Sequence, residues 1–238
     1  MSGPGARELI LGRLRAAAPA PSPDSGELER RIDAHQARQG AGQLRGASPS
    51  QLADTLARVM TSVRTDVWRA GVDDWPALLA QKLAAAGVGR LLLDTAGAEG
   101  AALASALPAA VRALSFDRPL EEWKEELFGS VDAGFTVARC GIAATGTLVL
   151  APDAGTPRTV SLVPPLHVAL VYASTLHADL HAAMHAEHWS AGMPSNLVLV
   201  SGPSKTSDIQ QTLAYGAHGP RALWLVIVDD GAAAGART

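Results

Sequence analysis

The stretch Ser201-Gly202-Pro203-Ser204-Lys205-Thr206-Ser207-Asp208-Ile209 follows an apolar run, Leu197 to Val200, that is typical of a buried strand. It opens with a glycine turn and then places polar residues from Lys205 onward where a helix would begin. Free backbone N–H groups point outward at a helix N-terminus, so strand, tight turn and polar helix start together predict an anion-binding corner.

Two alternatives bear on this corner. A Walker A loop needs a second glycine directly before its lysine, and Pro203-Ser204 stands there instead, so ATP hydrolysis of the P-loop type is not supported. An ordinary helix start, with Ser204 or Thr206 as cap and Lys205 in solvent, is the structural alternative.

Outward from this stretch, apolar strands alternate with helices. Leu91 to Asp94 and Leu223 to Asp229 are typical of buried strands, and Trp75 to Ala86 is a helix that stops at Gly87. This alternation predicts an α/β layered domain with a mainly parallel sheet. Strand-like runs between residues 131 and 172, one of them at 159–163, have no predicted helix between them and suggest an antiparallel or mixed insertion. Further helices are expected over residues 176–188 and 208–213.

The N-terminal part differs from this domain. Apolar positions have helical spacing over residues 6–18, and the run Ala18-Pro19-Ala20-Pro21-Ser22-Pro23 then predicts a linker. We therefore expect residues 1–49 to form a helical arm, residues 50–230 the α/β domain, and residues 231–238 a flexible tail. Simple disorder is the alternative for the arm.

Composition narrows the class of protein. The chain has 238 residues and a formal net charge of −3, which argues against a protein that coats nucleic acid. No run approaches the roughly 20 apolar residues of a membrane span, and the charged N-terminus does not fit a secretory signal. Cys140 is the single cysteine, whereas an iron–sulfur cluster usually needs four thiolates, so the chain should hold no such cluster by itself. Together these points predict a cytoplasmic protein.

A second candidate site is the turn at Thr145, Gly146 and Thr147, just before a strand. Such a turn brings backbone and two hydroxyls close to a ligand, although a plain tight turn is the alternative. Cys140, nearby, could be a nucleophile if a base lowered its pKa; a small buried filler is the other interpretation.

Histidines suggest two more sites. The run Val163-Pro164-Pro165-Leu166-His167 aims His167 at a strand entrance, and His218 also lies in a turn-rich segment, so acid–base or purely structural roles are both open. The spacing of His177, His181, His185 and His188 places them on one flank of the expected helix, as in zinc-binding helices. A solvated stripe is the alternative there, because Glu187 is expected to point to another side. No resident metal is predicted.

Several of these segments together resemble the LUD-domain family, and within it lactate utilization protein C. The matching pieces, in order over roughly residues 50–230, are Ala143–Leu150, Val163–His167, Pro194-Ser195-Asn196, Ser201–Ile209 and Gly216-Ala217-His218-Gly219-Pro220.

The resemblance implies a fold and a function. The fold should be a three-layer α/β sandwich similar to the sugar-phosphate isomerase and CoA-transferase superfamily (the NagB/RpiA/CoA transferase-like fold). The protein should be one of a set that together oxidises L-lactate to pyruvate, as a non-redox subunit that binds no cofactor, with the iron–sulfur clusters in partner subunits. The family usually has an acid where this chain has Ala144, and often Glu where Gln210 stands. The missing acid counts against the alternative, a stand-alone enzyme that transforms acyl-CoA or sugar phosphates.

On this hypothesis the two turns form one ligand-binding corner for a small anion or a partner. Lys205 would neutralise the anion, hydroxyls would donate hydrogen bonds, and His167 and His218 would line the rim. The predicted ligand-binding residues are Thr145, Gly146, Thr147, His167, Gly202, Ser204, Lys205, Thr206, Asp208 and His218.

Overall fold

The computed structural model describes residues 5–17, 24–38, 44–207 and 213–231, which divide into two units, Met1–Gly42 and Gln43–Thr238. The first unit contains α1 (Ala6–Ala16) and α2 (Ser25–Arg38). The helical spacing predicted over residues 6–18 is therefore matched by α1, which has no buried residues. The predicted linker from Ala18 to Pro23 and all but the first residue of the predicted tail lie outside the described residues.

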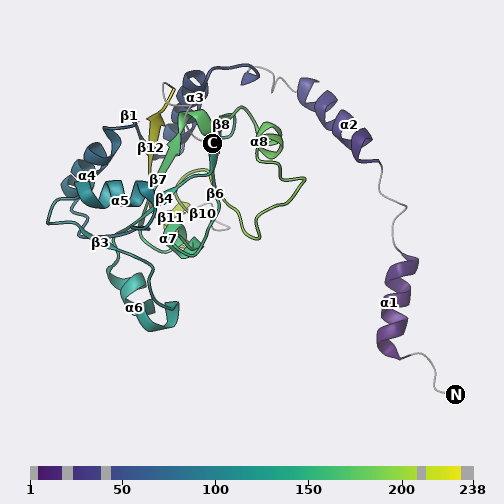
Figure 1. Ribbon diagram of the computed structural model, residues 1–238. Helices are drawn as coiled ribbons and strands as arrows, with labels where there is room; N and C mark the ends of the chain where they lie inside the picture. Colours follow the sequence, from purple (N-terminus) through teal and green to yellow (C-terminus); the bar gives the residue numbers. More distant parts are fainter. Residues whose placement is uncertain (1–4, 18–23, 39–43, 208–212, 232–238) are drawn as a thin grey trace. The chain divides into compact units, whose positions relative to one another are not determined.

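A six-stranded parallel sheet forms the centre of the second unit (Figure 1), in the order β1-β12-β7-β4-β2-β3. The strands are β1 (Thr65–Gly71), β2 (Arg90–Leu92), β3 (Arg112–Leu114), β4 (Ala133–Val137), β7 (Leu166–Tyr172) and β12 (Ala222–Asp229). The mainly parallel α/β fold predicted from the sequence is confirmed.

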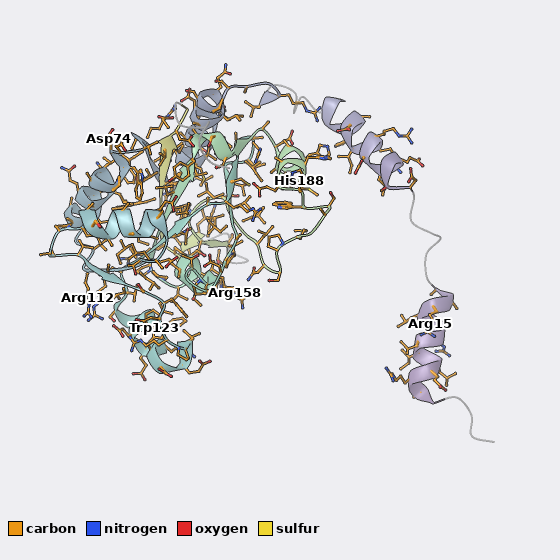
Figure 2. All side chains as sticks on the ribbon, viewed as in Figure 1. Arg15, Asp74, Arg112, Trp123, Arg158 and His188 are labelled. Atoms are coloured by element: carbon orange, nitrogen blue, oxygen red, sulfur yellow. The ribbon has the colours of Figure 1, made fainter. Side chains whose placement is uncertain are left out.

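Both faces of this sheet are buried, as parallel sheets require. Alternate residues of β7 serve opposite faces: Val168 and Leu170 pack with α4 (Trp75–Ala85) and α5 (Ala98–Ala106). Ala169 and Val171 pack with α3 (Pro49–Ser62) on the other face. Figure 2 shows side chains filling the space on either side of the sheet. The chain is thus layered, with helices on both faces.

Two further helices pack beside β2. They are α6 (Leu120–Ser130) and α7 (Arg158–Leu162), which share an apolar cluster with Leu92. The strand predicted over residues 159–163 is wrong, because this segment forms α7. Its β-branched residues favour a strand, but Pro157 in extended conformation starts a helical turn, and Val160 is buried there. A Cβ at Gly134 of β4 would lie 2.0 Å from the Val160 carbonyl oxygen, so glycine permits this close approach.

A smaller sheet, in the order β8-β5-β6-β9, covers part of the α3 face. Its strands are β5 (Cys140–Ile142), β6 (Thr147–Leu150), β8 (Leu176–His177) and β9 (Val198–Val200). Pairing is antiparallel except between β5 and β8. The mixed insertion expected between residues 131 and 172 is therefore present in β5 and β6, and it recruits two strands from later in the chain.

The long helix predicted over residues 176–188 is wrong at its start. Leu176 and His177 form β8, a 3-10 turn (η2, Ala173–Thr175) precedes it, and the helix α8 spans only Leu180–Ala186. The Asp179 side chain accepts a hydrogen bond from the Ala182 N–H at 2.8 Å, so it caps the helix at that point.

The helix predicted to begin at Lys205 is also wrong. Lys205–Ser207 form β10, which pairs antiparallel with β11 (Leu213–Tyr215). This hairpin is held to the preceding turn, because the Gly216 N–H donates to the Ser204 carbonyl oxygen at 3.0 Å. The Arg64 guanidinium also lies 4.8 Å from the centre of the Tyr215 ring. The helix predicted over residues 208–213, with Asp208 and Gln210, lies outside the described residues except for Leu213, which belongs to β11.

Within the described part of the chain, no helix combines the length and the apolar character that a bilayer crossing needs.

Candidate functional site

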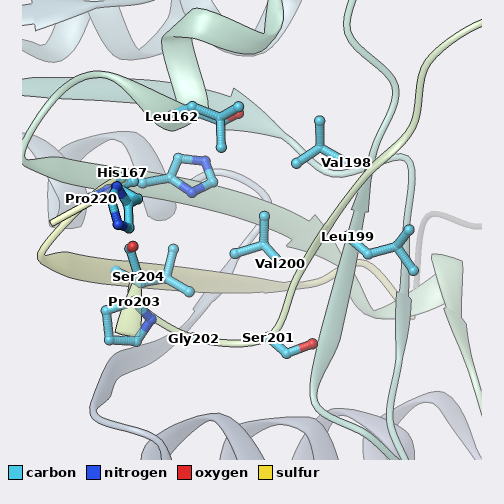
Figure 3. A pocket seen from close by; sticks show the side chains of 14 residues that line it. Leu162, His167, Val198, Leu199, Val200, Ser201, Gly202, Pro203, Ser204 and Pro220 are labelled. Atoms are coloured by element: carbon cyan, nitrogen blue, oxygen red, sulfur yellow. The ribbon is translucent and has the colours of Figure 1, made fainter. Parts of the chain in front are cut away.

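A pocket of about 180 Å³ opens at the amino ends of β7 and β12 (Figure 3). It is bounded by α7, by β9 and by the turns on either side of the hairpin. The lining residues are Ser161, Leu162, His167, Val198, Leu199, Val200, Ser201, Gly202, Pro203, Ser204, His218, Gly219, Pro220 and Leu223. Four of the residues predicted from the sequence, His167, Gly202, Ser204 and His218, therefore meet in one pocket.

His167 is held at the strand entrance by the prolines before it. The N–H groups of Arg221 and Ala222 donate to the Pro165 carbonyl oxygen at 2.9 and 3.2 Å, which joins the starts of β7 and β12. The imidazole is 1% exposed, and its Nε2 lies 2.8 Å from the Thr136 hydroxyl on β4. Burial lowers the pKa of His167 to about 4, so the ring is neutral near pH 7.

The Gly202 turn shapes the opposite wall. Gly202 has a φ of +126°, a left-handed conformation that favours glycine, and a Cβ there would lie 3.0 Å from Val63 Cγ2. The Ser204 N–H donates to the Pro220 carbonyl oxygen at 2.8 Å. These contacts hold Ser204 beside Gly219 and Pro220, with the exposed His218 at the rim.

The Thr145–Thr147 turn reaches this pocket indirectly. Thr147 Oγ1 lies 2.7 Å from Thr145 Oγ1 and 2.7 Å from the Ser201 hydroxyl, which lines the pocket. Gly146 has a φ of +61°, and a Cβ there would lie 2.5 Å from Val59 Cγ1, so the glycine serves the packing of the turn on α3. The two predicted turns are thus joined by a chain of hydroxyls, although none of residues 145–147 lines the pocket.

Charged groups stand away from the lining. Lys205 is exposed on β10 and Thr206 is half-buried beside it, and neither is among the lining residues. No lysine, arginine, aspartate or glutamate occurs among the described residues that line the pocket. Ala144, where the family resemblance led us to expect an acid, is exposed and also lies outside the lining. The pocket is therefore built from hydroxyls, two imidazoles and apolar side chains.

Sequence reasoning missed Thr136 and Ser161. Strand alternation does put Thr136 on one face of β4, but only the strand order, β4 beside β7, brings it to His167. Ser161 lay in the segment expected to be a strand. Ser201 stood inside the stretch that defines the corner, yet only the structure shows its bond to Thr147.

A second pocket, of about 240 Å³, lies at the carboxyl ends of β2 and β4 and carries the acids Asp94, Glu99 and Asp153. The Tyr172 hydroxyl donates to the Glu99 carboxylate at 2.9 Å. Thr136 is among its lining residues, so the Thr136–His167 bond runs between the two pockets.

The four histidines that were expected on one flank of a helix lie on different elements. His177 lies on β8, whereas His181 and His185 lie on α8 with ring centres 4.4 Å apart. His188 follows the helix with a φ of 53° and is labelled at the α8 side of the fold in Figure 2. The expectation that Glu187 points elsewhere is wrong, because its carboxylate lies near His177 and Cys140.

Cys140 is a buried residue in an apolar cluster with Ala183 and Trp189. Burial first, and the Glu187 carboxylate second, raise the pKa of the Cys140 thiol to about 12, against a lowering by Arg139. A thiol that is protonated at neutral pH is a poor nucleophile, which favours the buried-filler interpretation over the nucleophile.

The fold is that of an α/β protein with a pocket at one end of a parallel sheet. Residues 53–228 match the LUD domain, so the chain belongs to the LUD domain family.

Several curated proteins are similar to this chain in sequence. An uncharacterized protein of Neisseria meningitidis serogroup B is 41% identical over 174 residues, 72% of this chain and 75% of that protein. Lactate utilization protein C of Shouchella clausii is 36% identical over 102 residues, 42% of this chain and 44% of that protein. Lactate utilization protein C of an Exiguobacterium species is 28% identical over 195 residues, 79% of this chain and 82% of that protein.

A solved structure supports the fold. The crystal structure of a DUF162 family protein from Deinococcus radiodurans superposes with a TM-score of 0.58 at 20% identity, over 76% of this chain and 98% of that one. The NagB/RpiA/CoA transferase-like architecture is compatible with this likeness and stays a prediction.

Proposed function

We propose that this chain acts in lactate utilization, as a non-redox subunit of an iron–sulfur complex that oxidises L-lactate to pyruvate. Its pocket at the amino ends of β7 and β12 would hold a small hydroxy or oxo acid. Relatives named lactate utilization protein C support the process. The single cysteine of this chain supports a role without a cluster of its own, since a cluster usually takes four thiolates.

The observation that carries the choice of ligand is the size and chemistry of the pocket. A volume of about 180 Å³ has room for on the order of ten waters, whereas sites for drug-sized ligands run to roughly 300–1,000 Å³. Lactate or pyruvate fits that space, and a whole coenzyme A does not. This favours a small acid over the acyl-CoA chemistry of the alternative hypothesis.

The lining would bind such an acid through neutral groups. Ser201 and Ser204 offer hydroxyl donors, and the neutral His167 ring offers either a donor or an acceptor according to its tautomer. His218 lies at the exposed rim, where its imidazole offers a further hydrogen-bonding group. In this arrangement Lys205 acts at most from outside the pocket.

Growth on L-lactate as sole carbon source tests the process. A strain that lacks this chain should fail to grow on lactate and grow normally on glucose, and the wild-type chain should restore growth. His218→Ala and Ser204→Ala should restore it poorly if the pocket is the site. His185→Ala, at an exposed position on α8, is the matched control and should restore it fully. Normal growth of the deletion strain on lactate would contradict the proposal.

The partner proposal has a separate test. The tagged chain, captured from lactate-grown cells, should bring down iron and a protein with the absorbance of an iron–sulfur cluster, whereas glucose-grown cells provide the baseline. Capture of the chain alone, together with turnover of a CoA ester or sugar phosphate by the purified chain, would favour the stand-alone enzyme instead.

A further inference from the structure

Three side chains with metal-binding atoms meet between the small sheet and α8. Cys140 comes from β5, His177 from β8, and Glu187 stands at the C-terminal end of α8. One candidate ligand atom from each, the Cys140 sulfur, a His177 ring nitrogen and a Glu187 carboxylate oxygen, lie within 4.8 Å of one another. We call these three residues, Cys140, His177 and Glu187, the Cys140 cluster. We propose that the Cys140 cluster binds a zinc ion.

The strand register brings the first two ligands to one face. Ile142 of β5 pairs with His177 of β8, and Gly141 pairs with Leu176. Because side chains alternate along a strand, Leu176 packs toward the main core while His177 points to the other face, the face of Cys140 and Ile142. The helix α8 covers that face through Ala183 and ends at Ala186, directly before Glu187. The three ligands thus come from separate elements that the fold holds together.

The donor set suits zinc. Zinc binds thiolate sulfur at about 2.3 Å, imidazole nitrogen at about 2.0–2.1 Å and carboxylate oxygen at about 2.0–2.2 Å. Two ligand atoms on one tetrahedral zinc lie about 3.3–3.8 Å apart, so the Cys140 cluster needs to contract by about an ångström. A thiolate and a carboxylate supply the two negative charges that balance the ion. Mixed sulfur, nitrogen and oxygen ligands do not suit magnesium or calcium, which take oxygen.

The surroundings support a resident ion. Arg139 Nε donates to Glu187 Oε2, which holds the carboxylate in place beside the cluster. The thiol must release its proton on binding, as thiolate ligands of zinc do. Cys140 is fully buried but His177 is half-buried, so an ion can enter from the His177 side.

The histidines of α8 offer a competing explanation for any metal that binds. His181 and His185 lie one turn apart with their rings in contact, on the surface of the same helix. Such a pair can take up a divalent ion without any thiolate. A test must therefore report on the sulfur, which only the Cys140 cluster supplies.

Cobalt(II) is the probe, because a Co²⁺–thiolate bond gives a charge-transfer absorption in the near ultraviolet that histidine ligands do not give. The full chain, stripped with a chelator, is titrated with Co²⁺ and then with Zn²⁺. The wild type should show the band, saturating at one Co²⁺ per chain, and Zn²⁺ should displace it. Cys140→Ser should abolish the band, and His177→Gln or Glu187→Gln should weaken the affinity at least tenfold. The double variant His181→Ala, His185→Ala is the control and should keep the wild-type band and affinity.

A folded wild-type chain without a thiolate band would overturn the proposal, as would binding that disappears in the His181→Ala, His185→Ala control. Should Cys140→Ser fail to fold, the midpoint of thermal unfolding decides. Zn²⁺ should raise it in the wild type and not in Glu187→Gln, and an equal shift in both proteins would contradict the site.

Discussion

The pocket and the Cys140 cluster lie at opposite edges of the small sheet, and each contains one histidine with a lowered pKa. At the β9 edge, His167 is buried and its partner is a neutral hydroxyl, and none of the described residues that line the space carries a fixed charge. At the β8 edge, His177 is half-buried among a thiol, a carboxylate and an arginine. We therefore propose a small organic acid for the first region and a cation for the second. Burial alone lowers the pKa of His167, whereas at His177 burial lowers the pKa and the Glu187 carboxylate raises it.

The largest expected effect concerns the thiol at the β8 edge. With a pKa of about 12 instead of 9.0, the thiolate fraction of Cys140 near neutral pH falls roughly a thousandfold, and alkylation should slow at least that much. Timed reaction with a thiol reagent, in chelator, with and without denaturant, checks this. The chain has no other cysteine, so native and unfolded rates compare directly. A native rate near that of the unfolded chain would show that this edge is open.

A pH dependence should distinguish the pocket histidine. His167 has a pKa of about 4 when folded and an ordinary value of 6.5 when unfolded, so below pH 6.5 the unfolded chain binds the extra proton first. The stability that the neutral His167 ring contributes to the folded state is fully present above about pH 6.5, and it is lost as the pH falls toward 4. The loss in the free energy of unfolding should be about 3 kcal/mol. Denaturant titrations of wild type and His167→Gln over that range measure it.

In that experiment the variant should lose less stability than the wild type as the pH falls. His218→Gln, at an exposed position, is the control and should follow the wild type. Parallel curves for His167→Gln and wild type would mean that the buried imidazole does not resist protonation.

A backbone variant tests how rigid the pocket wall is. Gly202→Ala places a Cβ 3.0 Å from Val63 Cγ2 at a φ of +126°, so we expect a loss of about 2–3 kcal/mol in the free energy of unfolding. Gly192→Ala is the control, since a Cβ there meets nothing within 4 Å. Equal effects of the two substitutions, again by denaturant titration, would refute the strained turn.

The smallest effect is expected at Thr136. Thr136→Val leaves the buried His167 Nε2 without its partner and should cost about 1–2 kcal/mol, whereas Thr136→Ser keeps the hydroxyl. Thermal and denaturant unfolding of both variants measure the difference. A serine variant as unstable as the valine variant would point to lost packing of the methyl group instead of a lost hydrogen bond.

Local pattern predicted much of this fold. The apolar run Leu223–Asp229 formed β12 and the segment from Trp75 formed α4, and both could be predicted because each depends on neighbours in sequence. The failures depend on strand partners that the local pattern does not specify. Residues 205–207 pair with β11, and Leu176–His177 pair with β5, so strand pairing overrode the helix that was expected for each segment.

In the candidate site, too, the features that depend on local sequence were predicted and those that depend on packing between segments were not. His167, Gly202, Ser204 and His218 were identified from turns and prolines, whose geometry is local. Lys205 was expected to face the ligand because a helix start was expected, and the strand β10 removes that reason. The proximity of Glu187 to Cys140 could not be predicted, because it depends on where α8 crosses the small sheet.

The central claim, that the pocket at the β9 edge binds a small hydroxy or oxo acid, is tested most directly by nuclear magnetic resonance of the full chain with labelled histidine rings. L-lactate and pyruvate are added at constant pH in the presence of chelator, and variants assign the signals. The His167 and His218 resonances should shift and saturate, while those of His181 and His185 stay in place. Unchanged His167 and His218 signals at saturating acid, or shifts confined to α8, would contradict the account.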